Sequence, residues 1–273
     1  MSDLLKLLRQ KEQRGSKPRC HFLTHGTADQ VAARLTELIT PWGLVSRPDR
    51  WMPDGFRVTQ EAQLHRAPRL LDPAICKQLG AWWLPFDQQN ARTPNFDIAA
   101  TCTVEGKSGI VLVEAKAHYK ELDKESVGRA REVRKPTRSA LTETQEERNK
   151  SHETIGAAIE SARLGIAAAT KCDWHIARDT HYQMSNRFAW TWKLATLGTP
   201  VILVYLGFLG CSDMSKNGEQ PFPDHSSWER LVLSHSAPLF PPEVWNRRWA
   251  LNGVPFIPII RSMHQLLEPA TSA

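Results

Sequence analysis

The sequence predicts an α/β fold, and two kinds of pattern lead to that prediction. Residues 110–113 and 200–206 are apolar runs of the length expected for strands buried on both faces of a sheet. Ahead of the second run, residues 151–169 and 181–197 place apolar side chains at helical spacing. A helix, a short loop and an apolar strand in this order favour a layered α/β structure over a β-sandwich.

The composition is that of an ordinary globular protein. The chain has 273 residues, of which 41% are hydrophobic and 23% charged, and this length can bury a substantial core. The net charge of +6 mildly favours a polyanionic partner. No shift in composition marks a domain boundary, so a single domain is expected over residues 1–273.

The cysteines and the apolar runs predict a cytoplasmic protein. The five cysteines are scattered and form no Cys-x-x-Cys pair, so we expect reduced thiols. The N-terminal residues hold no sustained apolar stretch and are not expected to be a signal peptide. The longest apolar run, residues 201–209, is too short to cross a bilayer as a helix, so no membrane contact is expected.

Several helices are expected before the first strand. Residues 1–19 predict a short basic helix followed by a loop, and residues 27–40 predict a longer helix. A short helix is expected near Thr59, with Glu61 inside it, and another over residues 73–83.

A β-hairpin is predicted from residues 96–104 and 110–116, which are joined by a glycine-bounded turn of five residues. Glu114 and Lys116 lie two apart on the second strand, so their side chains share one face. The hairpin brings Asp97 beside them, and cross-strand neighbours lie about 5 Å apart. Charges at the end of a buried strand are costly unless they are paired or used.

These charges allow two interpretations, a metal site or a structural ion pair at the end of the strand. Asp97 and Glu114 offer carboxylate oxygens, and Ala115 offers a backbone carbonyl. Mg²⁺ prefers such oxygen ligands and retains several waters. Two carboxylates one strand spacing apart can therefore share one small cation.

The arrangement of Pro94-x-x-Asp97, a hairpin and Glu114-Ala115-Lys116 resembles the PD-(D/E)xK nuclease superfamily, which includes restriction endonucleases. The resemblance implies a metal-dependent endonuclease. Asp97, Glu114 and the carbonyl of Ala115 would bind Mg²⁺ or Mn²⁺. Lys116 would orient the attacking water or stabilise the developing negative charge.

The resemblance also implies an architecture and a partner. It covers roughly residues 94–207 and implies a restriction endonuclease-like core over about 55–210, with a central mixed β-sheet flanked by helices. Residues 1–54 would form an N-terminal helical extension and residues 211–273 a C-terminal one. The substrate would be DNA, double-stranded rather than single-stranded, and a homodimer or a partner subunit would suit double-strand cutting. The alternative is a non-catalytic nucleic-acid-binding or assembly subunit that keeps the fold.

Three further polar residues are candidates for the site. The family often adds an acid from an N-terminal helix, and Glu61 could fill that place, although a solvated surface position explains it as well. Gln183 could be the polar residue that some members carry on a later helix, or it could form a capping box with Thr180. His118 lies on the face of Glu114 and Lys116 by strand parity, or it is simply the polar exit of the strand.

A basic segment follows the hairpin and is the predicted nucleic-acid contact. Residues 119–150 are almost all polar. Lysine and arginine neutralise phosphates without reading sequence, and this position follows Lys116 directly. A solvated helix or mobile segment is the simpler alternative. The candidate cations are Arg129, Arg131, Arg134, Lys135 and Arg138.

Overall fold

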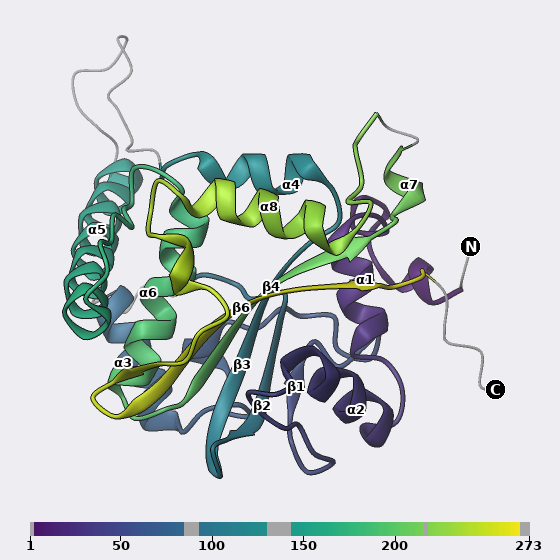
Figure 1. The fold of residues 1–273 in the computed structure, drawn as a ribbon, viewed down its shortest axis with the longest axis horizontal. Helices are drawn as coiled ribbons and strands as arrows, with labels where there is room; N and C mark the ends of the chain where they lie inside the picture. Colours follow the sequence, from purple (N-terminus) through teal and green to yellow (C-terminus); the bar gives the residue numbers. More distant parts are fainter. Residues whose placement is uncertain (1–2, 85–92, 130–142, 216–217, 268–273) are drawn as a thin grey trace.

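A computed structural model describes residues 3–84, 93–129, 143–215 and 218–267 of the chain. Six strands form one sheet in the order β1-β2-β3-β4-β6-β5 (Figure 1). The first three strands are antiparallel, β3, β4 and β6 are parallel, and β5 returns antiparallel to β6. The predicted α/β architecture, a central mixed sheet flanked by helices, is confirmed. The strands are β1 (Trp51–Met52), β2 (Ile98–Val104), β3 (Lys107–Lys116), β4 (Val201–Leu209), β5 (Trp249–Leu251) and β6 (Val254–His264).

Helices cover both faces of the sheet (Figure 1). Ile110 and Leu112 of β3 pack in the core beneath α3, α5, α6 and α8, whereas Val111 and Val113 pack in the core beneath α1 and α2. This alternation buries β3 on both faces, as its apolar run predicted. The helices are α1 (Ser16–Leu23), α2 (Ala28–Ile39), α3 (Pro73–Trp83), α4 (Tyr119–Asp123), α5 (Glu143–Thr170), α6 (Tyr182–Thr196), α7 (Ser212–Ser215) and α8 (His225–Ser236). Short 3₁₀ segments are η1 (Asp3–Leu7), η2 (Gln10–Glu12), η3 (Leu64–Arg66), η4 (Lys124–Ser126) and η5 (Pro242–Val244).

The hairpin of β2 and β3 has a tighter turn than the sequence predicted. Glu105 and Gly106 form a two-residue turn, and both have positive φ angles, 50° and 75°. Such turns match the twist of the flanking strands, and glycine accepts the conformation without steric cost. The resulting register pairs Ile98 with Val113, so the preceding residue, Asp97, comes to lie opposite Glu114.

Two predictions for the N-terminal part were wrong. No helix begins near Thr59, because Ala62 exchanges backbone hydrogen bonds of 3.0 and 3.2 Å with Phe96, which holds the chain around Glu61 extended. The predicted loop before residue 20 is largely helical, because α1 begins at Ser16 and carries its proline in the first turn, where proline is tolerated. The predicted helices over 27–40 and 73–83 are confirmed as α2 and α3.

The C-terminal part contributes to the sheet itself. Residues 211–273 were predicted to be an extension packed on the core, but β6 lies between β4 and β5. Its residues from Phe256 to Ile260 are buried, which explains why this apolar run joins the sheet. Within the described residues, no helix has the length and apolar character needed to cross a membrane.

Candidate functional site

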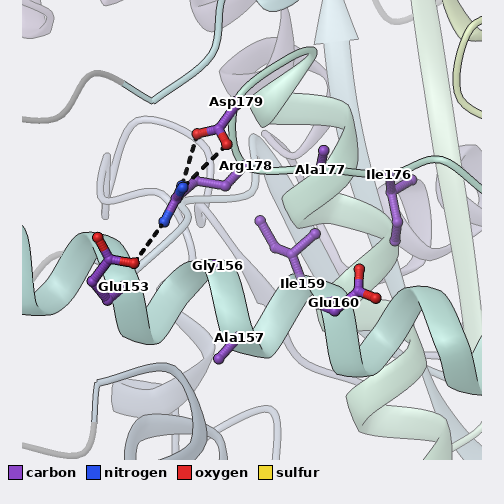
Figure 2. A pocket seen from close by; sticks show the side chains of 9 residues that line it. All are labelled: Glu153, Gly156, Ala157, Ile159, Glu160, Ile176, Ala177, Arg178 and Asp179. Atoms are coloured by element: carbon purple, nitrogen blue, oxygen red, sulfur yellow. Dashed lines mark hydrogen bonds and ion pairs between the residues drawn. The ribbon is translucent and has the colours of Figure 1, made fainter.

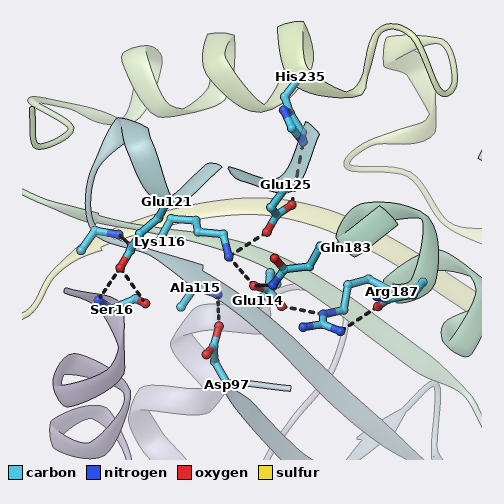
Figure 3. A network of polar contacts seen from close by, with 12 residues as sticks. Ser16, Asp97, Glu114, Ala115, Lys116, Glu121, Glu125, Gln183, Arg187 and His235 are labelled. Atoms are coloured by element: carbon cyan, nitrogen blue, oxygen red, sulfur yellow. Dashed lines mark hydrogen bonds and ion pairs between the residues drawn. The ribbon is translucent and has the colours of Figure 1, made fainter. Parts of the chain in front are cut away.

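Asp97 and the backbone of Ala115 meet at the end of the hairpin. Asp97 is half-buried, and one of its carboxylate oxygens, Oδ2, accepts a hydrogen bond of 2.7 Å from the Ala115 amide. In an antiparallel pair, the N–H and C=O of one residue point to the same side. The carbonyl of Ala115 therefore faces Asp97, and two of the three predicted oxygen ligands lie together (Figure 3).

Glu114 is fully buried and receives three donors (Figure 3). Its Oε1 accepts hydrogen bonds from Lys116 and, at 2.7 Å, from the side-chain amide of Gln183. Its Oε2 accepts from the guanidinium of Arg187 at 2.5 Å. Burial alone would raise the pKa of Glu114, but Arg187 and Lys116 outweigh it and hold that pKa below its ordinary value. Glu114 is therefore ionised at neutral pH.

Helix α6 supplies two of these donors from a single face. Gln183 and Arg187 are four residues apart, a spacing that places both side chains on one side of a helix. The predicted capping role of Gln183 was wrong, because α6 begins at Tyr182 and its N-cap is His181, which makes no side-chain capping bond. The structure thus places the side chain of Gln183 against Glu114. Sequence reasoning missed Arg187 as a partner of Glu114, and its spacing from Gln183 was the available signal.

Lys116 is buried between two carboxylates (Figure 3). Besides Glu114, its ammonium lies 2.7 Å from a carboxylate oxygen of Glu125, which is carried by η4. Burial raises the pKa of Glu125 to about 7, although Lys116 acts in the opposite direction. Burial lowers the pKa of Lys116, but Glu114 and Glu125 more than compensate and raise it above its ordinary value. Glu125 was not predicted, because it lies in a polar stretch without periodicity.

The site holds more acidic than basic groups. Asp97, Glu114 and Glu125 face two cations, Lys116 and Arg187. Burial and the nearby Glu114 raise the pKa of Asp97 well above its ordinary value, with Lys116 opposing them. A bound cation would offset this excess, because an opposite charge nearby stabilises an ionised carboxylate.

Glu61 lies at the border of the site. Glu61 accepts a hydrogen bond of 3.0 Å from Asn95 and pairs with Lys17 at 3.1 Å. Its charge contributes to the raised pKa of Asp97, so it lies near that carboxylate although it is on no helix.

His118 belongs to a neighbouring group of side chains. Its Nε2 lies 3.7 Å from a carboxylate oxygen of Glu121 and 3.9 Å from one of Glu219. Strand β3 ends at Lys116, so strand parity no longer applies at His118. The parity argument that placed His118 beside Glu114 was therefore wrong.

Only one of the predicted phosphate-binding cations lies within the described residues. Arg129 donates a hydrogen bond of 3.2 Å to the hydroxyl of Tyr182 at the start of α6. The other four, Arg131, Arg134, Lys135 and Arg138, lie outside the described residues.

The available ligands suit Mg²⁺ better than a softer metal. In the part of the chain that the structure describes, no three His, Cys, Asp or Glu side chains converge to hold a metal ion. The set available is the carboxylates of Asp97 and Glu114 with the carbonyl of Ala115. Mg²⁺ is commonly held by one or two carboxylates and several waters, so this set fits its chemistry.

Comparisons with known proteins found no relative. No protein-family model matches the chain, and no curated protein or solved structure matches it either. The functional interpretation therefore rests on the geometry of the site.

Replacing Glu114 is expected to destabilise the fold strongly. Glu114→Ala leaves Arg187 buried without its carboxylate partner, and breaking a buried ion pair from one side costs about 3–5 kcal/mol. The control is Glu105→Ala, which removes an exposed pair with Arg248 and should change the stability far less, because exposed ion pairs contribute little. Urea denaturation measures both. Equal, small losses would contradict the buried network.

Replacing Glu125 is expected to change how stability depends on pH. With a pKa of about 7 against an ordinary 4.5, folded Glu125 keeps a proton that the unfolded chain releases. This stabilisation is complete below about pH 4.5 and is lost as the pH rises through about 7. Between about pH 5 and 8, Glu125→Gln should therefore gain on the order of 2 kcal/mol relative to wild type in urea denaturation. A difference independent of pH would contradict the assignment.

Proposed function

We propose that the protein is a metal-dependent endonuclease of the PD-(D/E)xK type, which hydrolyses phosphodiester bonds in DNA. The observation that carries the proposal is the convergence of Asp97, Ala115, Glu114 and Lys116 at the end of one hairpin. The cytoplasm is the proposed location, and the five free cysteines support it because reduced thiols are typical of that compartment.

Each residue of the site has a proposed role. Asp97, Glu114 and the carbonyl of Ala115 would hold Mg²⁺ or Mn²⁺, which when bound lowers the pKa of a coordinated water and offsets negative charge on the phosphoryl group. Lys116 would donate a hydrogen bond to the phosphate as its charge develops. Arg187 would keep the Glu114 carboxylate in place from the side of α6.

A basic pocket beside β1 supports DNA as the partner. The pocket has a volume of about 240 Å³, and both arginines that line it, Arg66 and Arg69, are exposed. Both β1 and β3 run antiparallel to β2, so their carboxyl ends lie at one end of the sheet. Strands β1 and β3 are two strand spacings apart, which is roughly 10 Å. The pocket is also lined by Trp51, Met52, Asp54, Val58, Gln60, Ala67 and Pro68.

A larger pocket on another side is less suited to a polyanion. It has a volume of about 370 Å³ and lies between α5 and residues 176–179 (Figure 2). Glu153, Glu160 and Asp179 line it, and Arg178 is paired with two of these acids. Since Lys and Arg neutralise phosphates and the pocket beside β1 carries two exposed arginines against one acid, Asp54, the edge beside β1 is the better path for a nucleic acid.

One observation favours the alternative of a non-catalytic subunit. Both carboxylate oxygens of Glu114 already accept hydrogen bonds, from Lys116 and Gln183 on one side and from Arg187 on the other. A metal would share Glu114 with these donors. A protein that used the network only for stability would bind nucleic acid without cleaving it, in an assembly with a partner subunit or a second copy.

Plasmid cleavage separates the two functions. Wild type should nick supercoiled DNA with Mg²⁺ or Mn²⁺ but not with EDTA, and Asp97→Ala and Lys116→Ala should each lower the rate by at least about 100-fold. Lys107→Ala, at the exposed far end of β3, is the matched control and should retain the activity. Equal cleavage by all variants would contradict the site. DNA binding without any cleavage would support the non-catalytic alternative.

DNA binding should depend on the pocket beside β1. Arg69→Ala should weaken binding of a duplex oligonucleotide in EDTA and lower the slope of log K against log salt by about 1. Arg247→Ala is the control, because Arg247 is exposed and stacks over Trp249 at the opposite edge of the sheet. Fluorescence anisotropy measures both. A loss on Arg247→Ala as large as that on Arg69→Ala would contradict this path.

A further inference from the structure

Glu125 is a buried acid, and Lys116 is its one close partner within the part of the chain that the structure describes. It is 1% exposed, and one oxygen lies 2.7 Å from the Lys116 ammonium. Among the described residues, neither of its oxygens takes part in a hydrogen bond of good geometry. A buried carboxylate without hydrogen bonds is costly, so its place beside Lys116 calls for a compensating role.

The histidine next to Glu125, His235, also has a buried polar atom without a hydrogen-bond partner among the described residues. The Nε2 of His235 lies 3.8 Å from the second oxygen of Glu125 and, among the described residues, has no hydrogen-bond partner. Burial and the neighbouring His181 lower the pKa of His235 to about 4, so its imidazole is neutral at pH 7. His235 therefore brings no positive charge to Glu125. Lys116 is the cation that pairs with the Glu125 carboxylate.

The backbone fixes Glu125 relative to helix α6. His181 donates a backbone hydrogen bond of 3.1 Å to the carbonyl of Ser126, and Val127 pairs with Thr180 in an isolated bridge. A Cβ atom at Gly128 would lie 1.9 Å from the carbonyl oxygen of Asp179, so only glycine allows this close approach. The segment that carries Glu125 is thus tied to the start of the helix that carries the donors to Glu114.

Two carboxylates therefore define the position of one ammonium. Glu114 accepts a hydrogen bond from Lys116, and Glu125 attracts it from a second element of the fold. An ammonium has three N–H donors on a flexible stem, and an unrestrained lysine would sample many directions. We propose that Glu125 is a positioning residue, which holds the Lys116 ammonium beside Glu114 so that a remaining N–H meets the reacting phosphate group. This inference rests on the proposed nuclease function.

The kinetic test compares Glu125→Gln and Glu125→Asp with wild type and with Asp123→Asn. Asp123 is exposed on α4, two residues away, and has no role in the site. At pH 8, above the pKa of about 7 at which folded Glu125 loses its proton, Glu125→Gln should lower kcat at least 10-fold. KM should change less than two-fold, because Glu125 is buried. Glu125→Asp, which keeps the charge, should recover part of the rate, and Asp123→Asn should match wild type.

A spectroscopic measurement tests the same inference without catalysis. In protein labelled with ¹⁵N-lysine, the ammonium signal of Lys116, assigned by its loss in Lys116→Ala, should exchange slowly with water in wild type and rapidly in Glu125→Gln. An unchanged kcat or an unchanged ammonium signal would overturn the positioning role. If wild type itself does not cleave DNA, the nuclease proposal fails, and the ammonium signal still decides whether Glu125 positions Lys116.

Discussion

The burial of the Glu114 carboxylate is the constraint on which the rest of the site depends. A charge at the end of a strand that is buried on both faces is unfavourable unless cations and donors surround it. The chain meets this requirement from one other element and from the strand itself, with Arg187 and Gln183 on α6 and Lys116 on β3. The ion pairs thereby tie the parallel part of the sheet to the helical layer above it.

The register of the hairpin gathers the acidic groups at one end of the sheet. The tight turn at Glu105 and Gly106 sets the register that brings Asp97 opposite Glu114 and against the Ala115 amide. Burial and the neighbouring Glu114 raise the pKa of Asp97 well above its ordinary value, with Lys116 opposing them. A divalent ion at Asp97 would complete the charge balance of the site.

Local patterns were sufficient to predict the two strands of the hairpin and the charged residues that meet at its end. The apolar run of β3 and the spacing of Glu114 and Lys116 are contained within a few residues. Pairing between residues far apart in the chain determined the features that local patterns did not predict. Glu61 lies on an extended segment because Ala62 bonds to Phe96, and β6 enters the sheet because it pairs with β4. The contact of Arg187 with Glu114 joins residues 73 apart, and only the spacing of Arg187 from Gln183 hinted at it. Glu125 lies close to Lys116 in the chain, but a polar stretch without periodicity gives no sign that its side chain is buried beside Lys116.

Titration of Mn²⁺ into the nucleic-acid-free protein is the most direct test that this site is a metal centre. Isothermal calorimetry with wild type and Asp97→Ala, in the same buffer, compares the two affinities. The proposed metal centre predicts that wild type binds Mn²⁺ and that Asp97→Ala weakens binding by at least about 10-fold, because a carboxylate ligand is lost. An absence of binding by wild type, or equal affinities for the two proteins, would contradict a metal centre at Asp97 and Glu114.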